Sequence, residues 1–149
     1  MRSVSVARWL ACAALAVSAP LWARGSEDLP LPWNTPADPA ACTDQDSALW
    51  VEYANGQACI RYFSAVPLAH APVVIVMFHG DRNIEMHRAP AAIAGNTLRA
   101  KDRQAAALSR RAGVPVVIVA RPGTYGSSGN HGQRRQPAEF QALDAALDQ

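Results

Sequence analysis

The sequence has little excess charge of either sign and almost no lysine. Of its 149 residues, 14 are lysine or arginine and 12 are aspartate or glutamate, and Lys101 is the only lysine. Arg2 and Arg8 account for the positive excess, so the remainder holds twelve basic and twelve acidic residues. Such a balance offers no electrostatic attraction for nucleic acid or an anionic membrane. Hydrophobic residues make up 50%, which excludes a disordered composition.

No apolar run is long enough for an ordinary membrane span. The longest covers residues 9–21, about thirteen residues, whereas a spanning helix needs roughly twenty. The basic start at Arg2 and Arg8, the apolar run and a small residue at Ala23 are typical of a secretory signal. We therefore predict a signal peptide over residues 1–23 and a bacterial protein that is periplasmic or secreted, with no membrane attachment after cleavage. An uncleaved anchor is the alternative.

Cysteine is scarce, with three in the whole chain. Cys12 lies in the predicted signal peptide, which leaves Cys42 and Cys59 in the mature chain. A pair of cysteines in an exported chain predicts a disulfide, and two free buried thiols are the alternative. Closing a loop of this length stabilises the fold by about 3 kcal/mol by restricting the unfolded chain.

Motifs for metals and cofactors are missing as well. His79 and His87, with Glu85 between them, match neither a zinc finger nor a His-Glu-x-x-His site. The glycines at 123, 126 and 129 do not form Gly-x-Gly-x-x-Gly, and no Lys-Ser/Thr pair follows a phosphate-binding loop. We expect neither a metal nor a cofactor. A Rossmann-type nucleotide domain remains a structural alternative.

The segment after the predicted signal, residues 24–47, is a proline-rich leader. Pro30, Pro32, Pro36 and Pro39 lie close together in it. Proline at this density excludes a helix or a central strand. We expect an extended segment that lies over the surface of the domain formed by residues 48–149.

Strand patterns begin at residue 48. Residues 49–53 and 58–63 have strand composition, and Asn55-Gly56 between them is a strong turn signal, so we predict an antiparallel hairpin. Residues 73–78 are apolar without alternation, which predicts a strand with both faces buried.

A helix and a second buried strand follow. We predict the helix over residues 97–112, with Asn96 as its N-terminal cap. Gly113 is expected to end it in a left-handed backbone conformation. Residues 116–119 are the second buried strand, and a strand, helix, strand succession makes the two strands parallel. A last helix begins near Pro137. Its expected buried stripe consists of Phe140, Leu143 and Leu147.

Each of the two buried strands runs into a glycine-containing loop. His79-Gly80-Asp81 follows the first, and Arg121-Pro122-Gly123-Thr124-Tyr125-Gly126-Ser127-Ser128-Gly129 follows the second. Open α/β folds place their chemistry at this end of a parallel sheet. The succession of hairpin, strand, helix and strand with these motifs resembles the α/β-hydrolase superfamily over residues 48–149. The closest likeness is to bacterial proteins related to dienelactone hydrolases and to the catalytic domains of prolyl-oligopeptidase-type serine peptidases.

The resemblance implies an α/β fold that is an incomplete α/β-hydrolase sheet, with an N-terminal hairpin plus two parallel strands and their crossover helix. It also implies an oxyanion hole in the turn at Gly80 and Asp81, where backbone N–H groups face the developing negative charge. By position, the resemblance puts this role on the N–H of Asp81, with that of Arg82 as an additional donor. The Asp81 carboxylate then needs Arg82 or Arg121 to neutralise it. His79 either shapes this turn or takes part in catalysis. The residues expected to form the site wall are His79, Arg121, Gly123 and Tyr125, the last by packing or through its hydroxyl.

The nucleophile of the resembled family is absent. That family carries its serine in Gly-x-Ser-x-Gly, a pattern found nowhere in this sequence, and Ser127 and Ser128 have the wrong spacing. In the family the strand bearing the serine follows the helix in which this chain ends, and the acid and histidine come later. His131 is therefore misplaced for the triad and is expected to order its loop.

The sequence thus predicts the N-terminal half of an exported serine hydrolase. Its full-length parent would hydrolyse a small-molecule ester or a peptide, and this portion would be inactive alone. The alternative is a non-catalytic exported binding or structural protein that uses half of an α/β fold.

Overall fold

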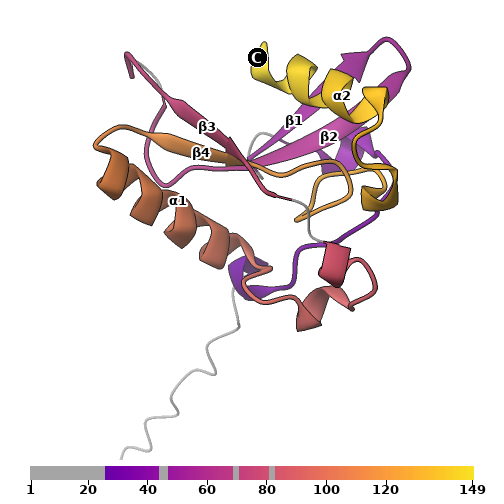
Figure 1. Cartoon of the computed structure of the whole chain (residues 1–149), viewed down its shortest axis with the longest axis horizontal. Coiled ribbons are helices and arrows are strands. Elements are labelled where there is room, and N and C mark those ends of the chain that lie inside the picture. Colours follow the sequence, from indigo (N-terminus) through magenta and orange to yellow (C-terminus); the bar gives the residue numbers. More distant parts are fainter. Residues whose placement is uncertain (1–25, 44–46, 69–70, 81–82) are drawn as a thin grey trace, which may run out of the picture.

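The structure, a computed structural model, describes residues 26–43, 47–68, 71–80 and 83–149. This part of the chain forms a mixed four-stranded sheet in the order β1-β2-β4-β3, with two α-helices packed on it (Figure 1). The α/β class predicted from the sequence is confirmed at this level. The predicted signal peptide lies outside the described residues.

The first two strands form the predicted antiparallel hairpin, β1 (Ala48–Tyr53) and β2 (Gly56–Phe63). Tyr53 pairs with Gly56, so the turn comes at Ala54 and Asn55, one residue earlier than predicted. A Cβ atom on Gly56 would lie 3.0 Å from the phenolic oxygen of Tyr53. Glycine therefore permits the close approach of the tyrosine ring at the start of β2.

The other two strands run parallel, as predicted. β3 (Ile75–Phe78) pairs with β4 (Val116–Val119), and α1 (Leu98–Ala112) connects them. β4 also pairs with β2 in the antiparallel sense, which joins the hairpin and the parallel strands into one sheet. The carboxyl ends of β3 and β4 consequently lie at the same end of the sheet.

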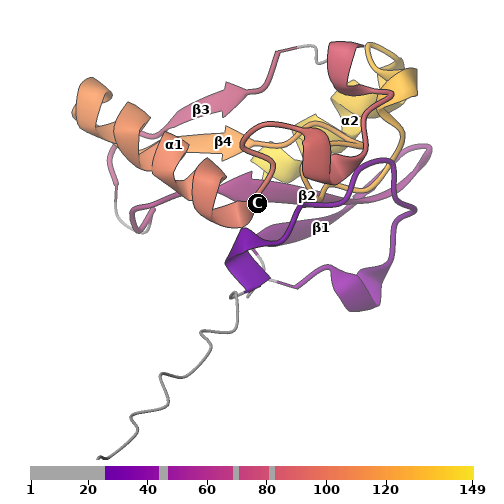
Figure 2. The same ribbon diagram turned by 90° about the horizontal axis from the view of Figure 1, so that it is seen from below.

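The two helices cover opposite faces of this sheet (Figures 1 and 2). Side chains alternate between the faces along β4. Ile118 packs with Ala105 of α1, whereas its neighbour Val117 packs in the cluster that contains Leu143 of α2 (Pro137–Leu147). The α2 helix lies mainly over the hairpin.

The β3 strand is more exposed than the sequence predicts. Both of its faces were expected to be buried, but Ile75, Val76 and Phe78 are exposed. The expectation fails because β3 lies at the edge of the sheet and α2 packs over β1 and β2 instead. β4, which lies between β2 and β3, is buried at all of its positions, as predicted.

The N-terminal cap of α1 also differs from the prediction. Thr97, not Asn96, caps the helix, because its hydroxyl accepts a hydrogen bond from the backbone N–H of Ala100 at 3.2 Å. Asn96 is buried, and its amide donates to the carbonyl of Leu31 at 2.8 Å. The asparagine therefore fixes the leader to the start of α1. Gly113 ends the helix at a φ of 72°, as predicted.

The α2 helix begins at the predicted proline but buries a different face. Only Leu143 of the expected stripe is buried, whereas Phe140 is 60% and Leu147 is 49% exposed. Alanine side chains turn toward the hairpin instead, and their small size lets the helix approach the sheet closely. The buried residues of α2 are Glu139, Ala142, Leu143 and Ala146.

In its described residues, 26–43 and 47, the leader contains two short 3-10 turns, η1 (Ser26–Asp28) and η2 (Pro39–Ala41), and two isolated β-bridges, Pro30 with Thr97 and Thr35 with Ser128. Its backbone hydrogen-bonds to the loop after β4. The predicted disulfide between Cys42 and Cys59 is present and ties the end of the leader to β2. Further 3-10 turns lie in the connections, namely η4 (Asn83–Glu85), η5 (Pro90–Ala92) and η6 (His131–Gln133).

Candidate functional site

The loops that follow β3 and β4 meet at the carboxyl ends of these strands. The ring of His79, directly after β3, lies 4.6 Å from the ring of Tyr125 in the loop after β4. Two of the four predicted wall residues are thus in contact. Asp81 and Arg82, the predicted oxyanion donors, lie outside the described residues, and their role remains a prediction. Gly80 is exposed.

Tyr125 is a buried packing residue. Its side chain is fully buried, and its ring lies 5.0 Å from the ring of Trp33 in the leader. The ammonium group of Lys101, itself buried on α1, lies 3.6 Å from the centre of the ring. A cation over an aromatic face is attracted by the ring quadrupole. The tyrosine therefore joins the leader, α1 and the His79 turn.

Gly123 permits a close approach of two parts of the same loop. Its φ is +77°, a left-handed conformation that glycine adopts readily. A Cβ atom at this position would lie 2.2 Å from the backbone nitrogen of His131. That nitrogen donates to the side chain of Asn34 at 2.8 Å. His131 is fully buried with its ring 5.8 Å from that of Trp33, which agrees with the predicted role in ordering the loop.

The hydroxyls of Ser127 and Ser128 attach this loop to the sheet. The Oγ of Ser127 accepts from the backbone N–H of Arg61 at 2.9 Å and donates to the carbonyl of Ala120 at 3.0 Å. The Oγ of Ser128 accepts from the backbone N–H of Cys59 at 2.8 Å. Both serines are buried. Their contacts are those of structural residues, and neither hydroxyl is presented to solvent.

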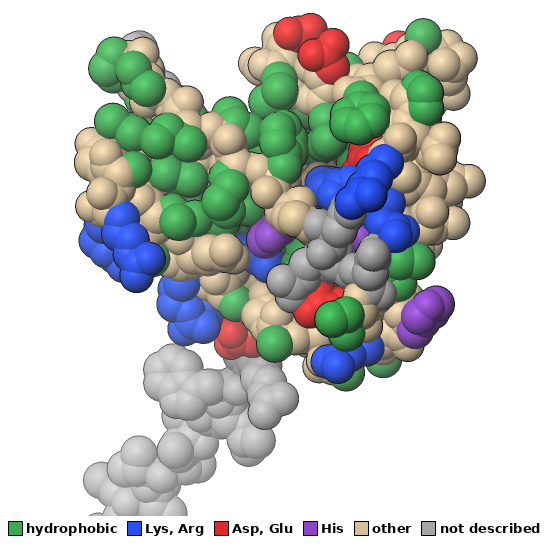
Figure 3. Space-filling model, viewed as in Figure 1, with side chains coloured by type: hydrophobic (Ala, Val, Ile, Leu, Met, Phe, Trp, Pro, Cys, Tyr) green, Lys and Arg blue, Asp and Glu red, His purple; other side chains and the backbone are tan. Residues whose placement is uncertain are grey.

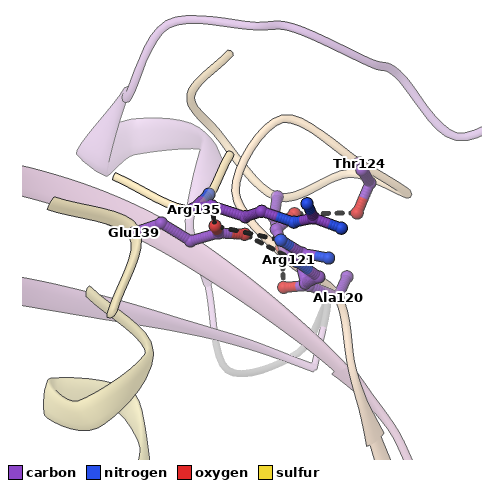
Figure 4. Close-up of polar contacts among 6 residues, drawn as sticks. Ala120, Arg121, Thr124, Arg135 and Glu139 are labelled. Atoms are coloured by element: carbon purple, nitrogen blue, oxygen red, sulfur yellow. Dashed lines mark hydrogen bonds and ion pairs between the residues drawn. The ribbon is translucent and has the colours of Figure 1, made fainter. Parts of the chain in front are cut away.

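An ion pair links the loop after β4 to α2 at the same end of the sheet. The guanidinium of Arg121 donates two hydrogen bonds to the carboxylate of Glu139, from Nε at 2.6 Å and from Nη2 at 3.0 Å. The backbone N–H of Arg135 donates to the same carboxylate. Figure 4 shows how the two side chains, from different elements, point toward one another. Two parallel hydrogen bonds fix both the distance and the orientation of the helix start.

The sequence interpretation missed this role of Glu139. Burial alone would raise the pKa of Glu139. The hydrogen bonds from Arg121 and Arg135, with the positive charge of Arg121, outweigh burial and hold the pKa below its ordinary value. The carboxylate is therefore charged at neutral pH. The only sequence signal for this role is an acidic residue close to a pair of arginines, and many exposed helices carry the same pattern.

An apolar groove of about 910 Å³ opens beside this ion pair. Figure 3 shows hydrophobic side chains gathered between the α2 side and the β3 side of the molecule, with basic side chains at one end. Of the predicted wall residues, His79 and Arg121 line the groove, whereas Gly123 and Tyr125 do not. Its apolar lining consists of Phe78, Phe140, Leu143 and Leu147.

A second hollow of about 560 Å³ lies between the hairpin, the leader and the loop after β4. Its lining is more polar and includes Tyr53, Gln57 and Asn130. Glu139 borders both hollows. Within the described ranges, no group of three or more His, Cys, Asp or Glu side chains is placed to hold a metal ion.

Comparison with protein-family models, with curated proteins and with solved structures finds no match to this chain. In the part of the chain that the structure covers, neither α-helix is both long and apolar enough to cross a membrane.

Proposed function

We propose that this chain supplies the N-terminal part of an exported α/β-hydrolase-type acyl hydrolase. The observation that carries the proposal is the contact between the two loops that bear its motifs. His79 after β3 and Tyr125 after β4 lie side by side, at the end of the sheet where α/β folds place their sites. The Cys42–Cys59 disulfide supports export, because such bonds persist in oxidising compartments.

In this proposal the chain contributes the turn at Gly80 and Asp81 as oxyanion donors, and His79 and Arg121 as walls of the site. The nucleophile, base and acid lie outside residues 1–149. Ser127 and Ser128 are buried and hydrogen-bonded, which leaves them unable to attack an acyl carbon. The substrate class is an ester or a peptide.

A serine-reactive fluorophosphonate tests this assignment. The purified 149-residue chain is expected to stay unlabelled, as judged by intact mass, while subtilisin under the same conditions is fully labelled. Stoichiometric labelling at Ser127 or Ser128 would contradict the proposal, because the nucleophile would then lie inside this chain.

A second candidate is a non-catalytic exported binding protein. The observation that favours it is the open apolar groove between β3 and α2, whose lining among the described residues includes no serine or cysteine. Ligand binding by the 149-residue chain with no downstream nucleophile in the gene would favour this candidate over the hydrolase.

A further inference from the structure

We propose that residues 30–35 of the leader form a strap that orders the loop after β4, and that the Cys42–Cys59 disulfide fastens this strap once the chain is in an oxidising compartment. The loop carries Gly123 and Tyr125, two residues that the sequence places in the site wall. The proposal goes beyond the function proposed above, because it concerns how this loop is ordered. Only its redox step rests on the predicted export.

Hydrogen bonds join the strap to the loop along most of its length. Thr35 of the strap forms an isolated parallel bridge with Ser128 of the loop. Three loop N–H groups donate to the strap, and one strap N–H donates to the loop. These bonds run from Gly126 to the carbonyl of Pro32 at 2.8 Å, from Gly129 to the carbonyl of Thr35 at 2.7 Å, from His131 to Oδ1 of Asn34 at 2.8 Å, and from Asn34 to the carbonyl of Gly123 at 3.1 Å. The strap therefore pairs with both ends of the segment 123–131.

The backbone of the loop needs such support. Tyr125 is a non-glycine residue with a φ of 47°, in the left-handed region, and such conformations persist where the surrounding structure holds them. Gly123 and Gly126 have positive φ values as well, 77° and 89°. The ring of Trp33 in the strap packs edge-on against the ring of Tyr125, with 5.0 Å between their centres. The strap thus holds the residue whose own backbone preference opposes the loop conformation.

The strap is anchored separately from the loop, at the residue that precedes the cap of α1. The indole N–H of Trp33 donates to Oδ1 of Asn96 at 3.0 Å, and the amide of Asn96 donates to the carbonyl of Leu31 at 2.8 Å. The backbone N–H of Leu31 donates in turn to the carbonyl of Asn96 at 2.9 Å. Both Leu31 and Asn96 are buried. Trp33 therefore connects an anchored strap to the loop.

The disulfide shortens the tether that holds a detached strap near its place. Cys42 follows the strap and is bonded to Cys59, whose backbone N–H and carbonyl both pair with Ser128 of the loop. With the bond closed, the six residues 36–41 separate the strap from this fixed point; with it open, the twelve residues 36–47 separate the strap from β1. The entropic cost of returning a detached segment rises with its tether, and this doubling favours detachment about threefold.

Fastening the strap is a two-electron oxidation. The thiols of Cys42 and Cys59 lose two protons and two electrons as the S–S bond forms, and a protein or small-molecule disulfide takes them up and becomes two thiols. Reducing compartments keep such thiols reduced, whereas the bond persists in oxidising ones. The strap is therefore fastened after export.

Amide hydrogen exchange of the 149-residue chain, followed residue by residue by NMR, tests the strap. Trp33→Ala should speed exchange at three loop glycines by one common factor of at least about tenfold, because the strap loses its anchor. These reporters are Gly123, Gly126 and Gly129. The decisive one is Gly123, whose N–H donates within the loop, to the carbonyl of Ser128 at 2.9 Å. If Gly123 exchanges as in the wild type while the other two speed up, the loop keeps its conformation without the strap and the proposal is overturned.

Leu143→Ala is the matched control. Leu143 is buried in α2, on the other face of the sheet, so its truncation weakens the domain without removing a contact of the strap. It should speed exchange at Ala120, whose N–H donates to the carbonyl of Arg61, and leave the three loop glycines unchanged. Equal acceleration at all four amides would overturn the proposal, because the loop would then open only with the whole domain.

Reduction of the wild-type chain tests the fastening. Breaking the disulfide should speed exchange at the three loop glycines about threefold, the factor that follows from the doubled tether. Unchanged rates, or the same acceleration as at Ala120, would overturn the redox step. Should Trp33→Ala fail to fold, Asn34→Ala, which removes the acceptor of the His131 N–H, provides the same comparison. None of these rates depends on a nucleophile, so their outcome is separate from that of the hydrolase proposal.

Discussion

At the scale of single residues, the pair of Arg121 and Glu139 determines how α2 meets the sheet. The Glu139 side chain is only 4% exposed, and its carboxylate has three donors from two segments of the chain. Removing one partner of such a pair leaves a buried charge without compensation, which costs more than the pair contributes.

Glu139→Gln is therefore expected to lower the free energy of unfolding by about 3 kcal/mol, measured by urea denaturation at neutral pH. The paired replacement Arg121→Met with Glu139→Leu should recover most of the loss, because no buried charge remains. Asp148→Asn, at an exposed acid near the end of α2, is the control. A loss under about 0.5 kcal/mol, as for a surface pair, would contradict the assignment.

The same pair predicts a dependence on pH. The pKa of Glu139 in the folded state lies below its unfolded value of 4.5, so the pair's contribution is fully present above pH 4.5. It is lost as the pH falls through the folded pKa. The difference in stability between wild type and Glu139→Gln should shrink steadily on acidification below pH 4.5. A difference that grows at low pH would mean the opposite sign of the pKa shift.

Gly123 yields a third prediction at this scale. Gly123→Ala should lower the free energy of unfolding by more than about 2 kcal/mol, because the new methyl group meets the backbone at a positive φ. Gly80→Ala, where a Cβ atom would meet nothing within 4 Å, should leave stability nearly unchanged. Thermal unfolding of the two variants provides the comparison.

At the scale of elements, the leader is attached to the domain by the disulfide and by backbone hydrogen bonds to the loop after β4. Replacing Cys42 and Cys59 together by serine should lower the free energy of unfolding by about 3 kcal/mol, because the unfolded chain regains the freedom of the closed loop. Calorimetric unfolding of the variant checks this. The wild-type protein in the presence of a reductant should unfold at the same free energy as the variant. If the oxidised wild-type protein and the variant are equally stable, the prediction is contradicted.

The elements themselves were largely predictable, and the faces they bury were not. Turn and cap residues such as Gly56 and Gly113 act locally, so the hairpin and the end of α1 could be located from the sequence. How exposed β3 is, and which face of α2 is buried, both depend on which strands α2 packs against. The apolar pattern of Phe140, Leu143 and Leu147 does not indicate which strands the helix packs against.

The candidate site was likewise predictable from the sequence only in part. The loops after β3 and β4 were predicted from the parallel order of the strands. The buried pair of Arg121 and Glu139 joins residues 18 positions apart through the packing of α2, and no local pattern marks it. Ser127 and Ser128 were excluded by spacing, and the structure adds the reason that their hydroxyls hold the loop against β2.

At the scale of the whole molecule, the central claim is that this chain is part of a larger acyl-transfer enzyme. The mixed sheet, the meeting of the two loops and the apolar groove beside them support it. The groove and the exposed strand β3 leave room on one face of the sheet for further polypeptide or for a ligand. These two uses are separable by experiment.

The most direct measurement is the DNA sequence of the genomic locus beyond codon 149. The account predicts coding for a strand-type apolar run followed by Gly-x-Ser-x-Gly, in the same frame or after a single frameshift or stop. A genuine stop with no such coding in any downstream frame would contradict it.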